Sequence, residues 1–376
     1  MAATPWLVRI GGRVLLPLAL VTVGCGGGTT ISGCGATCPP PPRAEFLYAM
    51  NGKGFNPPFA IDIFAISPTT GTLGPPTAVP VGAPFSSFAA TPSGKYIYTS
   101  VAENFTVDPK NGALTQIANS GYGVVASYIA IDTRGKFLYA ADASNPGNVA
   151  GLSIDSSTGA LTAVPGSPFP IGNSGNASLA IDPGAKFLFA GNAGGGISVF
   201  SIDSTSGALS PVPGSPFQTI FPGSPDKIIV HPNGKFLYAT LNGPGETIEA
   251  SFAVASDGSL SPTPNSWGPD GTLAESAVID PGGKFLYTAL TNDFAIAGYA
   301  VDQTSGSLTV LGFYSGVDPW DLVVDPSGQF LYVSDLASPG IVTLRIAPGG
   351  ALAQVGQPAL VKAGTVPLGV GLVQVQ

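Results

Sequence analysis

Short apolar runs rich in aromatic residues recur along the chain, separated by Gly, Pro, Asp and Ser. Runs of this length between turn-forming residues are typical of β-strands. One run consists of an aromatic, an apolar and a second aromatic residue, usually after a Gly-Lys turn. Its seven copies lie 41 to 50 residues apart, at Phe46–Tyr48, Lys95–Tyr98, Lys136–Tyr139, Lys186–Phe189, Lys235–Tyr238, Lys284–Tyr287 and Gln329–Tyr332.

A second motif, a Gly with a Leu two residues later, also recurs in seven copies at intervals of 41 to 51 residues. Its glycines are Gly71, Gly112, Gly159, Gly207, Gly258, Gly306 and Gly350. A period of about 40 to 50 residues made of short strands indicates propeller blades. We therefore predict an all-β fold, a seven-bladed β-propeller with four antiparallel strands per blade. In the fourth blade we expect strands at Ser178–Asp182, Lys186–Ala190, Ile197–Ile202 and Leu209–Val212.

The ends of the repeated region predict how the ring closes. The region enters on the second strand of a blade, at Phe46, and ends in a run that reads as a first strand, Leu368–Val375. The C-terminal strand is therefore expected to join the N-terminal blade, which removes a free sheet edge. Both repeated hairpin turns fall on one face of such a ring. Binding residues are expected on the other face, whose loops vary from blade to blade.

The first 43 residues do not share the repeat. Arg9 and Arg13 precede a short apolar run at 14–23, which has the length of a signal-peptide core and is too short to cross a bilayer. The small residue Gly24 before Cys25 is similar to a lipoprotein signal, with ordinary secretion as the alternative. We predict a signal peptide at 1–24, lipid on Cys25, a Gly/Pro-rich tether at 25–43 and the propeller at 44–376.

This N-terminus predicts an exported lipoprotein that faces the periplasm or the cell surface, for example on the outer membrane. The lipid would be its only contact with the membrane, and we expect a monomer. The net charge of −8 and the pI near 4.5 argue against a nucleic-acid partner, because an acidic surface repels phosphates. We predict no cofactor and no metal; Ca²⁺ bound by surface acids is the alternative.

The repeated units resemble those of lactonase-type seven-bladed propellers, the family of 6-phosphogluconolactonase and the muconate-cyclising enzymes. The resemblance covers about 44–376 and is carried by Asp280–Tyr287, Thr158–Leu161, Gly166–Phe169 and Gly214–Phe217. It implies the propeller fold and a lactone-hydrolysing activity. Every matching residue belongs to a repeat that builds blades, so the reaction has to be argued from other residues.

Sorting the charges by face predicts that the face with the variable loops, here called the mouth of the propeller, is negatively charged. Eleven acids are expected there, against Lys53, Lys227 and Lys362. The acids are Glu103, Asp142, Asp226, Glu246, Glu249, Asp270, Glu275, Asp293, Asp318, Asp321 and Asp335. An acidic mouth argues against a phosphorylated substrate, because phosphate recognition normally recruits Arg.

The sequence offers few groups for catalysis. The only histidine, His231, stands where other blades have a turn Asp, so we predict a structural role and no Ser-His-Asp triad. Paired carboxylates that activate water remain, and Asp318, Asp321 and Asp335 of the last blade are the catalytic candidates. The ligand-binding candidates are Glu103, Asp142, Asp226, Glu246, Asp293 and Trp320, whose indole could stack on a sugar ring.

Two functions follow from these residues. The first is hydrolysis of an uncharged lactone or sugar derivative on the acidic face. The alternative is a non-catalytic propeller that binds a protein or a glycan at the cell surface.

Overall fold

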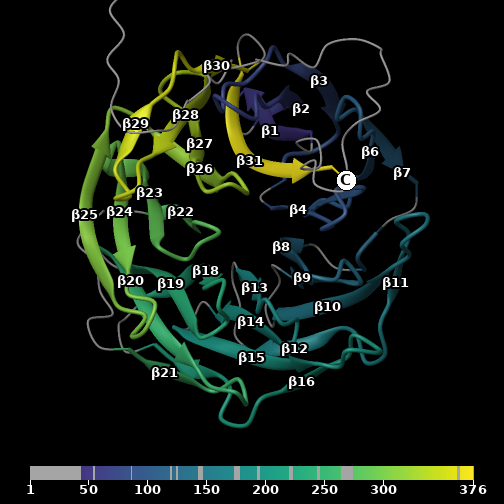
Figure 1. Cartoon of the computed structure of the whole chain (residues 1–376). Helices are drawn as coiled ribbons and strands as arrows, with labels where there is room; N and C mark the ends of the chain where they lie inside the picture. Colours follow the sequence, from purple (N-terminus) through teal and green to yellow (C-terminus); the bar gives the residue numbers. More distant parts are fainter. Residues whose placement is uncertain are drawn as a thin grey trace, which may run out of the picture. The chain divides into compact units, whose positions relative to one another are not determined.

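The structure is a computed structural model in which seven small antiparallel sheets form a ring (Figure 1). All of them belong to the compact unit Pro42–Gln376. The predicted all-β seven-bladed propeller is therefore confirmed. The described residues are 44–53, 56–85, 87–118, 121–123, 126–142, 147–172, 178–192, 195–219, 223–243, 246–263, 274–361 and 365–375.

Each blade has four antiparallel positions, numbered here from the inside of the ring outward. Blade 1 contains β31 (Val366–Gln374), β1 (Glu45–Lys53), β2 (Asn56–Ala65) and β3 (Thr77–Val81). Blade 2 contains β4 (Phe88–Ala90), β5 (Tyr96–Thr99), β6 (Asn104–Val107) and β7 (Leu114–Ile117). Blade 3 contains β8 (Ala126–Ile131), β9 (Phe137–Asp142), β10 (Gly147–Ile154), and β11 (Leu161–Ala163) with β12 (Phe169–Gly172) at the outer position.

The remaining blades follow the same order. Blade 4 contains β13 (Leu179–Ile181), β14 (Phe187–Asn192), β15 (Gly196–Ile202), and β16 (Leu209–Pro211) with β17 (Phe217–Gln218). Blade 5 contains β18 (Ser224–Val230), β19 (Phe236–Gly243), β20 (Glu246–Val254) and β21 (Leu260–Pro262). Blade 6 contains β22 (Ala274–Ile279), β23 (Phe285–Leu290), the short 3-10 helix η1 (Thr291–Asp293), β24 (Ala295–Val301) and β25 (Leu308–Ser315). Blade 7 contains β26 (Pro319–Val324), β27 (Phe330–Asp335), β28 (Gly340–Ile346), and β29 (Leu352–Gln354) with β30 (Ala359–Leu360).

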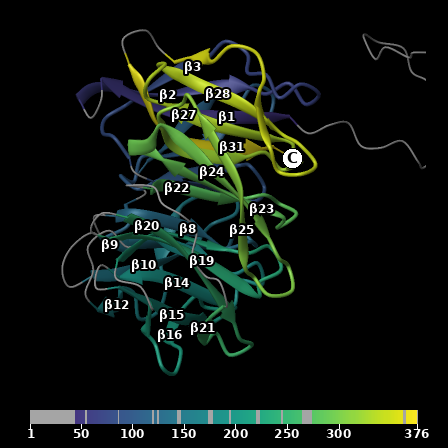
Figure 2. The same ribbon diagram turned by 90° about the vertical axis from the view of Figure 1, so that its left-hand side faces the viewer.

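The ring closes as the chain ends predict. Strand β31 pairs with β1 from Glu45 opposite Gln374 to Gly52 opposite Val366. Both views place the C-terminal strand beside β1 (Figures 1 and 2). The last strand thus supplies the innermost position of the first blade.

Among the described residues, no helix is long and apolar enough to cross a membrane. The segment 1–43, with the predicted signal peptide and Cys25, lies outside the described residues.

The turn between the first two strands of a blade is held by one carboxylate. In blade 6, Asp280 Oδ1 accepts the amide N–H groups of Lys284 and Phe285, both at 2.6 Å. Asp132, Asp182 and Asp325 make the same pair of bonds in their blades. His231 replaces this Asp in blade 5: its Nδ1 accepts the amide of Asn233, and its Nε2 lies 2.9 Å from the carbonyl oxygen of Gly283 in blade 6. The buried His231 therefore has the predicted structural role.

The two sequence motifs meet at every boundary between blades. The motif glycine of each blade lies against the first aromatic residue of the preceding blade, and a Cβ on Gly207 would lie 2.5 Å from Phe137 Cδ1. The second aromatic residue adds a bond: Tyr139 Oη donates to the carbonyl oxygen of Gly207 at 2.9 Å. Four further tyrosines make the equivalent bond, namely Tyr48 to Gly112, Tyr98 to Gly159, Tyr287 to Gly350 and Tyr332 to Gly71.

The boundary between blades 5 and 6 holds a buried carboxyl group. Glu249 is 2% exposed, and the hydroxyl groups of Thr240 and Thr288 donate to it at 3.1 and 2.9 Å. Burial raises the pKa of Glu249 to about 7, although these hydroxyl bonds lower it. In five other blades the matching third-strand residue is apolar: Ile61, Val149, Ile197, Ile296 and Ile341.

The expectation that Glu249 lies at the mouth is therefore wrong. Strands β19 and β20 pair as far as Gly243 opposite Glu246. Glu249 therefore lies three residues inside β20, and its side chain packs against blade 6 instead of lying in a surface loop.

The contact between motifs predicts a large difference between two glycine substitutions. Gly207→Ala should lower the free energy of unfolding by about 2–4 kcal/mol, because Gly207 has φ +76° and its new Cβ would overlap Phe137. Gly349→Ala is the matched control, since a Cβ there meets nothing within 4 Å. Thermal unfolding of both variants checks the prediction, and equal melting temperatures would contradict it.

Removal of residues 368–376 tests ring closure. The truncation deletes most of β31, including the buried Leu368, Val370, Val373 and Val375, and exposes the edge of β1. At about 1.5 kcal/mol or more for each buried side chain, the loss should exceed about 5 kcal/mol. A truncated protein that melts like the intact chain would show that β31 is dispensable.

Glu249 predicts a pH-dependent stability. Its folded-state pKa of about 7 lies above the usual 4.5, so between these values the folded state binds a proton that the unfolded state has lost. The free energy of unfolding should therefore fall by about 3 kcal/mol as pH rises from about 4.5 to about 7, and then level off. Denaturant unfolding across this range should show a weaker fall in Glu249→Gln and Glu249→Ile, and both variants should exceed the native protein in stability at pH 8. Variants with an unchanged pH slope would refute this origin.

Candidate functional site

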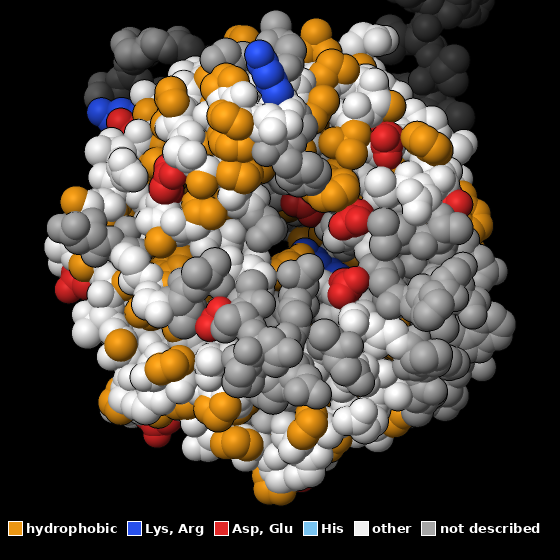
Figure 3. Space-filling view, turned by 180° about the vertical axis from the view of Figure 1, so that it is seen from behind, with side chains coloured by type: hydrophobic (Ala, Val, Ile, Leu, Met, Phe, Trp, Pro, Cys, Tyr) orange, Lys and Arg blue, Asp and Glu red, His pale blue; other side chains and the backbone are white. Residues whose placement is uncertain are grey.

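The innermost strands enclose a pocket of about 850 Å³, here called the central pocket. Residues of β4, β8, β13, β18, β22, β26 and β31 line it, so every blade contributes. Figure 3 shows acidic side chains around a central hollow with a basic side chain inside it. The charged residues that line the pocket are Asp226, Lys227, Glu275 and Asp321.

A β-bulge at a recurrent position directs residues into this pocket. In β18, Pro225 pairs with Leu241 and Lys227 with Thr240, so Asp226 is an extra residue with no partner in the neighbouring strand. The same irregularity makes Ser127, Glu275, Trp320 and Leu368 extra residues of their strands. All five line the central pocket. Bulges commonly redirect side chains beside functional sites, and here they do so in five of the seven blades.

Asp321 ties three successive blades together at the pocket wall. Its Oδ1 accepts the hydroxyl of Ser276 in blade 6 at 2.7 Å and the amide of Leu322 at 2.9 Å. Its Oδ2 accepts the amide of Val370 in blade 1 at 3.0 Å. These three bonds fix the carboxylate of Asp321 in one orientation.

Lys227 is the one cationic side chain among the described residues that line the central pocket. Burial lowers its pKa, but Tyr128 and the negative charge of Asp321 more than offset this effect, so the pKa is raised overall. Its Nζ lies 5.4 Å from the centre of the Tyr128 ring, which comes from blade 3. Lys227 is therefore a charged ammonium group in a pocket whose other charged residues are acids.

Glu275 and Asp226 come from bulges of neighbouring blades and influence one another. Burial raises the pKa of Glu275, and the negative charge of Asp226 raises it further. A carboxylate with a raised pKa is a stronger proton acceptor than an ordinary one, which suits a general base near neutral pH. Two carboxyl groups, a cation and the aromatic Trp320 thus line the same pocket.

Three of the predicted site residues therefore lie in the central pocket: Asp226, Trp320 and Asp321. Lys227 and Glu275 were expected at the mouth, without a specific role. A positional signal exists, because the bulged residue stands five positions before the turn residue of its blade. Glu275 precedes Asp280 in this way, and Asp226 precedes His231.

The other two catalytic candidates lie together in blade 7 and do not line the central pocket. Asp335 is 1% exposed and caps the loop after β27: its Oδ1 accepts the amides of Asp318 and Ala337, and its Oδ2 accepts the Ser338 hydroxyl. Burial raises the pKa of Asp318, and the charge of Asp335 adds to this. These bonds give Asp335 a loop-capping role; its catalytic role, like that of Asp318, stays a prediction.

The remaining ligand candidates are spread over other blades. Glu103 accepts the amide of Gly82 in blade 1 at 2.9 Å, Asp142 ends β9, and Asp293 lies exposed in η1. The side chain of Glu246 lies outside the described residues, as do Asp270 and Lys362. Among the described residues, no three His, Cys, Asp or Glu side chains converge as a metal site would require.

Comparison with known proteins gives consistent matches. Residues 100–213 and 224–367 match the family model for lactonase, 7-bladed beta-propeller. The chain is 26% identical over 286 residues to a 6-phosphogluconolactonase of Formosa agariphila, which covers 68% of this chain and 79% of the relative.

Two solved structures share the fold. A candidate 6-phosphogluconolactonase of Bacteroides uniformis has a TM-score of 0.72 at 20% identity and covers 88% of this chain and 99% of its own. A periplasmic gluconolactonase of Pseudomonas aeruginosa has a TM-score of 0.70 at 19% identity and covers 89% of this chain and 100% of its own. The family model spans more than half of the sequence, and the chain therefore belongs to the lactonase family of seven-bladed β-propellers.

Proposed function

We propose that this protein hydrolyses an uncharged sugar lactone in the central pocket. The observation that carries the proposal is the combination, on bulged inner strands, of the Glu275–Asp226 pair, the Lys227 ammonium and Trp320. Family membership supports lactone chemistry, and the residues of the pocket support a neutral substrate.

Each group has a role in the hydrolysis. Glu275 takes a proton from a water molecule, whose oxygen attacks the lactone carbonyl carbon. Negative charge builds on the carbonyl oxygen, and the Lys227 ammonium stabilises it by a charge-assisted hydrogen bond. The ester C–O bond of the ring then breaks, and the proton held by Glu275 passes to the departing oxygen, which yields a hydroxy acid.

The other residues position these groups. Asp321 holds its charge beside Lys227 and fixes three blades around it. Burial and, to a smaller extent, the charge of Asp226 keep the pKa of Glu275 raised. Trp320 offers a flat apolar surface on which the C–H face of a sugar ring can stack.

The charge of the pocket favours an uncharged lactone over a phosphorylated one. One lysine faces three acids there, whereas a phosphate group needs several cationic or bidentate partners. A neutral lactone also fits export: we propose that the signal-like 1–24 segment and lipid on Cys25 hold the propeller outside the cytoplasm, where sugar phosphates are scarce.

Turnover of δ-gluconolactone and of its 6-phosphate by the purified protein, followed by acid release in a pH-stat, tests the proposal. We expect the neutral lactone to be preferred by at least about 100-fold in kcat/KM. Glu275→Gln and Lys227→Met should each lower kcat about 10²–10³-fold, while Asp257→Asn, an exposed acid in a hairpin turn outside the pocket, should not change it. Activity should rise with pH as Glu275 loses its proton.

Two results would contradict the proposal. Loss of activity in Asp318→Asn or Asp335→Asn, with Glu275→Gln active, would move the site to the acids of blade 7. No turnover across a broad panel of neutral lactones would favour the non-catalytic alternative, a propeller that binds a protein or a glycan.

A further inference from the structure

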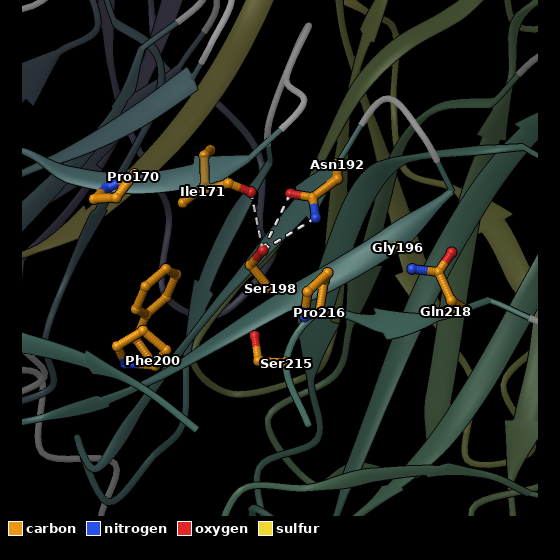
Figure 4. A pocket seen from close by; sticks show the side chains of 10 residues that line it. Pro170, Ile171, Asn192, Gly196, Ser198, Phe200, Ser215, Pro216 and Gln218 are labelled. Atoms are coloured by element: carbon orange, nitrogen blue, oxygen red, sulfur yellow. Dashed lines mark hydrogen bonds between the residues drawn. The ribbon is translucent and has the colours of Figure 1, made fainter. Parts of the chain in front are cut away.

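A second pocket, here called the side pocket, lies at the outer part of blade 4, where it meets blade 3 (Figure 4). It has a volume of about 310 Å³ and is lined from β12, β14, β15 and the segment that leads from β16 into β17. None of its lining residues lines the central pocket. The lactone chemistry proposed above makes no use of it.

The floor of the side pocket is polar and buried. Asn192 is 6% exposed and Ser198 is 4% exposed. Asn192 Nδ2 donates to Ser198 Oγ at 3.0 Å, and the Ser198 hydroxyl lies 3.2 Å from the carbonyl oxygen of Ile171 and 3.4 Å from Asn192 Oδ1. The Ser198 hydroxyl can donate only one hydrogen bond, and the carbonyl oxygen of Ile171 is the nearer of its two possible acceptors. Asn192 therefore keeps an amide hydrogen and acceptor capacity on Oδ1 for a further partner.

A missing side chain opens the space above this floor. A Cβ on Gly196 would lie 3.2 Å from Gln218 Nε2 and 3.7 Å from Asn192 Nδ2. Two primary amides thus converge on the volume that a side chain at position 196 would fill, as the labelled residues in Figure 4 show. The exposed Pro170 and Pro216 form an apolar rim, and Phe200 lies in the floor.

Blade 3 shows that this construction is not required by the fold. It has the same Gly-Ser-Pro-Phe unit at Gly166–Phe169, and Ser167 Oγ accepts a third-strand amide there as Ser215 Oγ does in blade 4. At the matching positions blade 3 keeps a polar side chain, Asp142 for Asn192, but has Asn148 for Gly196, Ala150 for Ser198 and Leu152 for Phe200. The buried Ser198 hydroxyl and the open space at Gly196 are therefore features that the shared architecture does not need, and such features indicate a ligand site.

The chemistry of the lining defines the ligand class. Among the described residues that line the side pocket, none carries a charge, so neither an anion nor a cation finds a counter-charge. A purely apolar ligand would leave the amide groups without partners, which is unfavourable. The lining suits a neutral molecule with hydroxyl groups and apolar C–H faces. Its hydroxyl groups would exchange hydrogen bonds with the amides, and its C–H faces would contact the prolines.

We propose that the side pocket is a binding site for a single neutral sugar ring, either free or as a residue of a glycan. Asn192 and Gln218 bind its hydroxyl groups, and Pro170 and Pro216 contact its C–H faces. This inference goes beyond the proposed hydrolysis and does not depend on it.

Saturation-transfer NMR of the full chain with methyl β-glucoside, methyl β-galactoside and N-acetylglucosamine tests the site. At least one glycoside should receive saturation from the native protein. Gly196→Val fills the space, against the flexible end of Gln218, and should abolish the transfer. Gln218→Ala should weaken binding about tenfold in a titration, and Gln354→Ala, an exposed glutamine of blade 7, is its matched control and should have no effect.

A third variant distinguishes binding in the side pocket from binding in the central pocket. Trp320→Ala removes the proposed stacking surface of the central pocket, so transfer to the glycosides should persist in it. Transfer to none of the three sugars would overturn the inference, as would transfer lost in Trp320→Ala. If Gly196→Val fails to fold, an unchanged Kd in Gln218→Ala overturns it instead. Lactone turnover should be unchanged in both side-pocket variants, so either proposal can fail without the other.

Discussion

The contact between a glycine of one blade and an aromatic residue of the blade before it is the constraint on which the ring depends. Each of the seven glycines has a positive φ, and a Cβ on any of them would lie 2.6 Å or less from an aromatic ring of the preceding blade. Glycine meets two requirements at this position. It adopts the positive φ, and it has no Cβ that would overlap the aromatic side chain. Because Tyr332 of the last blade bonds Gly71 of the first, the same contact that stacks the blades also closes the circle.

This constraint explains why the repeated residues say so little about activity. The turn Asp, the Lys, the aromatic pair and the glycine all lie on the face that carries the hairpin turns, where Lys136 also reaches the turn carbonyls of Ser204 and Thr205 in the next blade. With the blades fixed on that side, the inner strands can change locally without loss of the ring. A bulge adds one residue to an inner strand, and that residue faces the central pocket instead of the sheet.

The sequence predicted the blade number, the closure and part of the site, because these rest on periodic residues and on charge. Asp226, Trp320 and Asp321 were selected because they fall in segments that vary from blade to blade. Glu249 was assigned to the same variable segments, but it lies within strand β20, Glu246–Val254, and its side chain is buried. Asp335 and Asp321 are both acids of blade 7. Their contacts show that Asp335 caps a loop, whereas the charge of Asp321 acts on Lys227.

Departures from the repeat are therefore the informative residues of this protein. Glu249 stands where five other blades have an apolar residue, Lys227 brings a cation into a pocket whose other charged residues are acids, and Gly196 with Ser198 opens a polar space that blade 3 lacks. Each departure weakens packing or leaves polar groups buried, and seven nearly equivalent blades provide an internal standard by which to recognise it. In a propeller, differences between blades identify residues that the shared architecture does not require, as differences between homologues do in other folds. Residues that the ring does not need are the ones to which a function can be assigned.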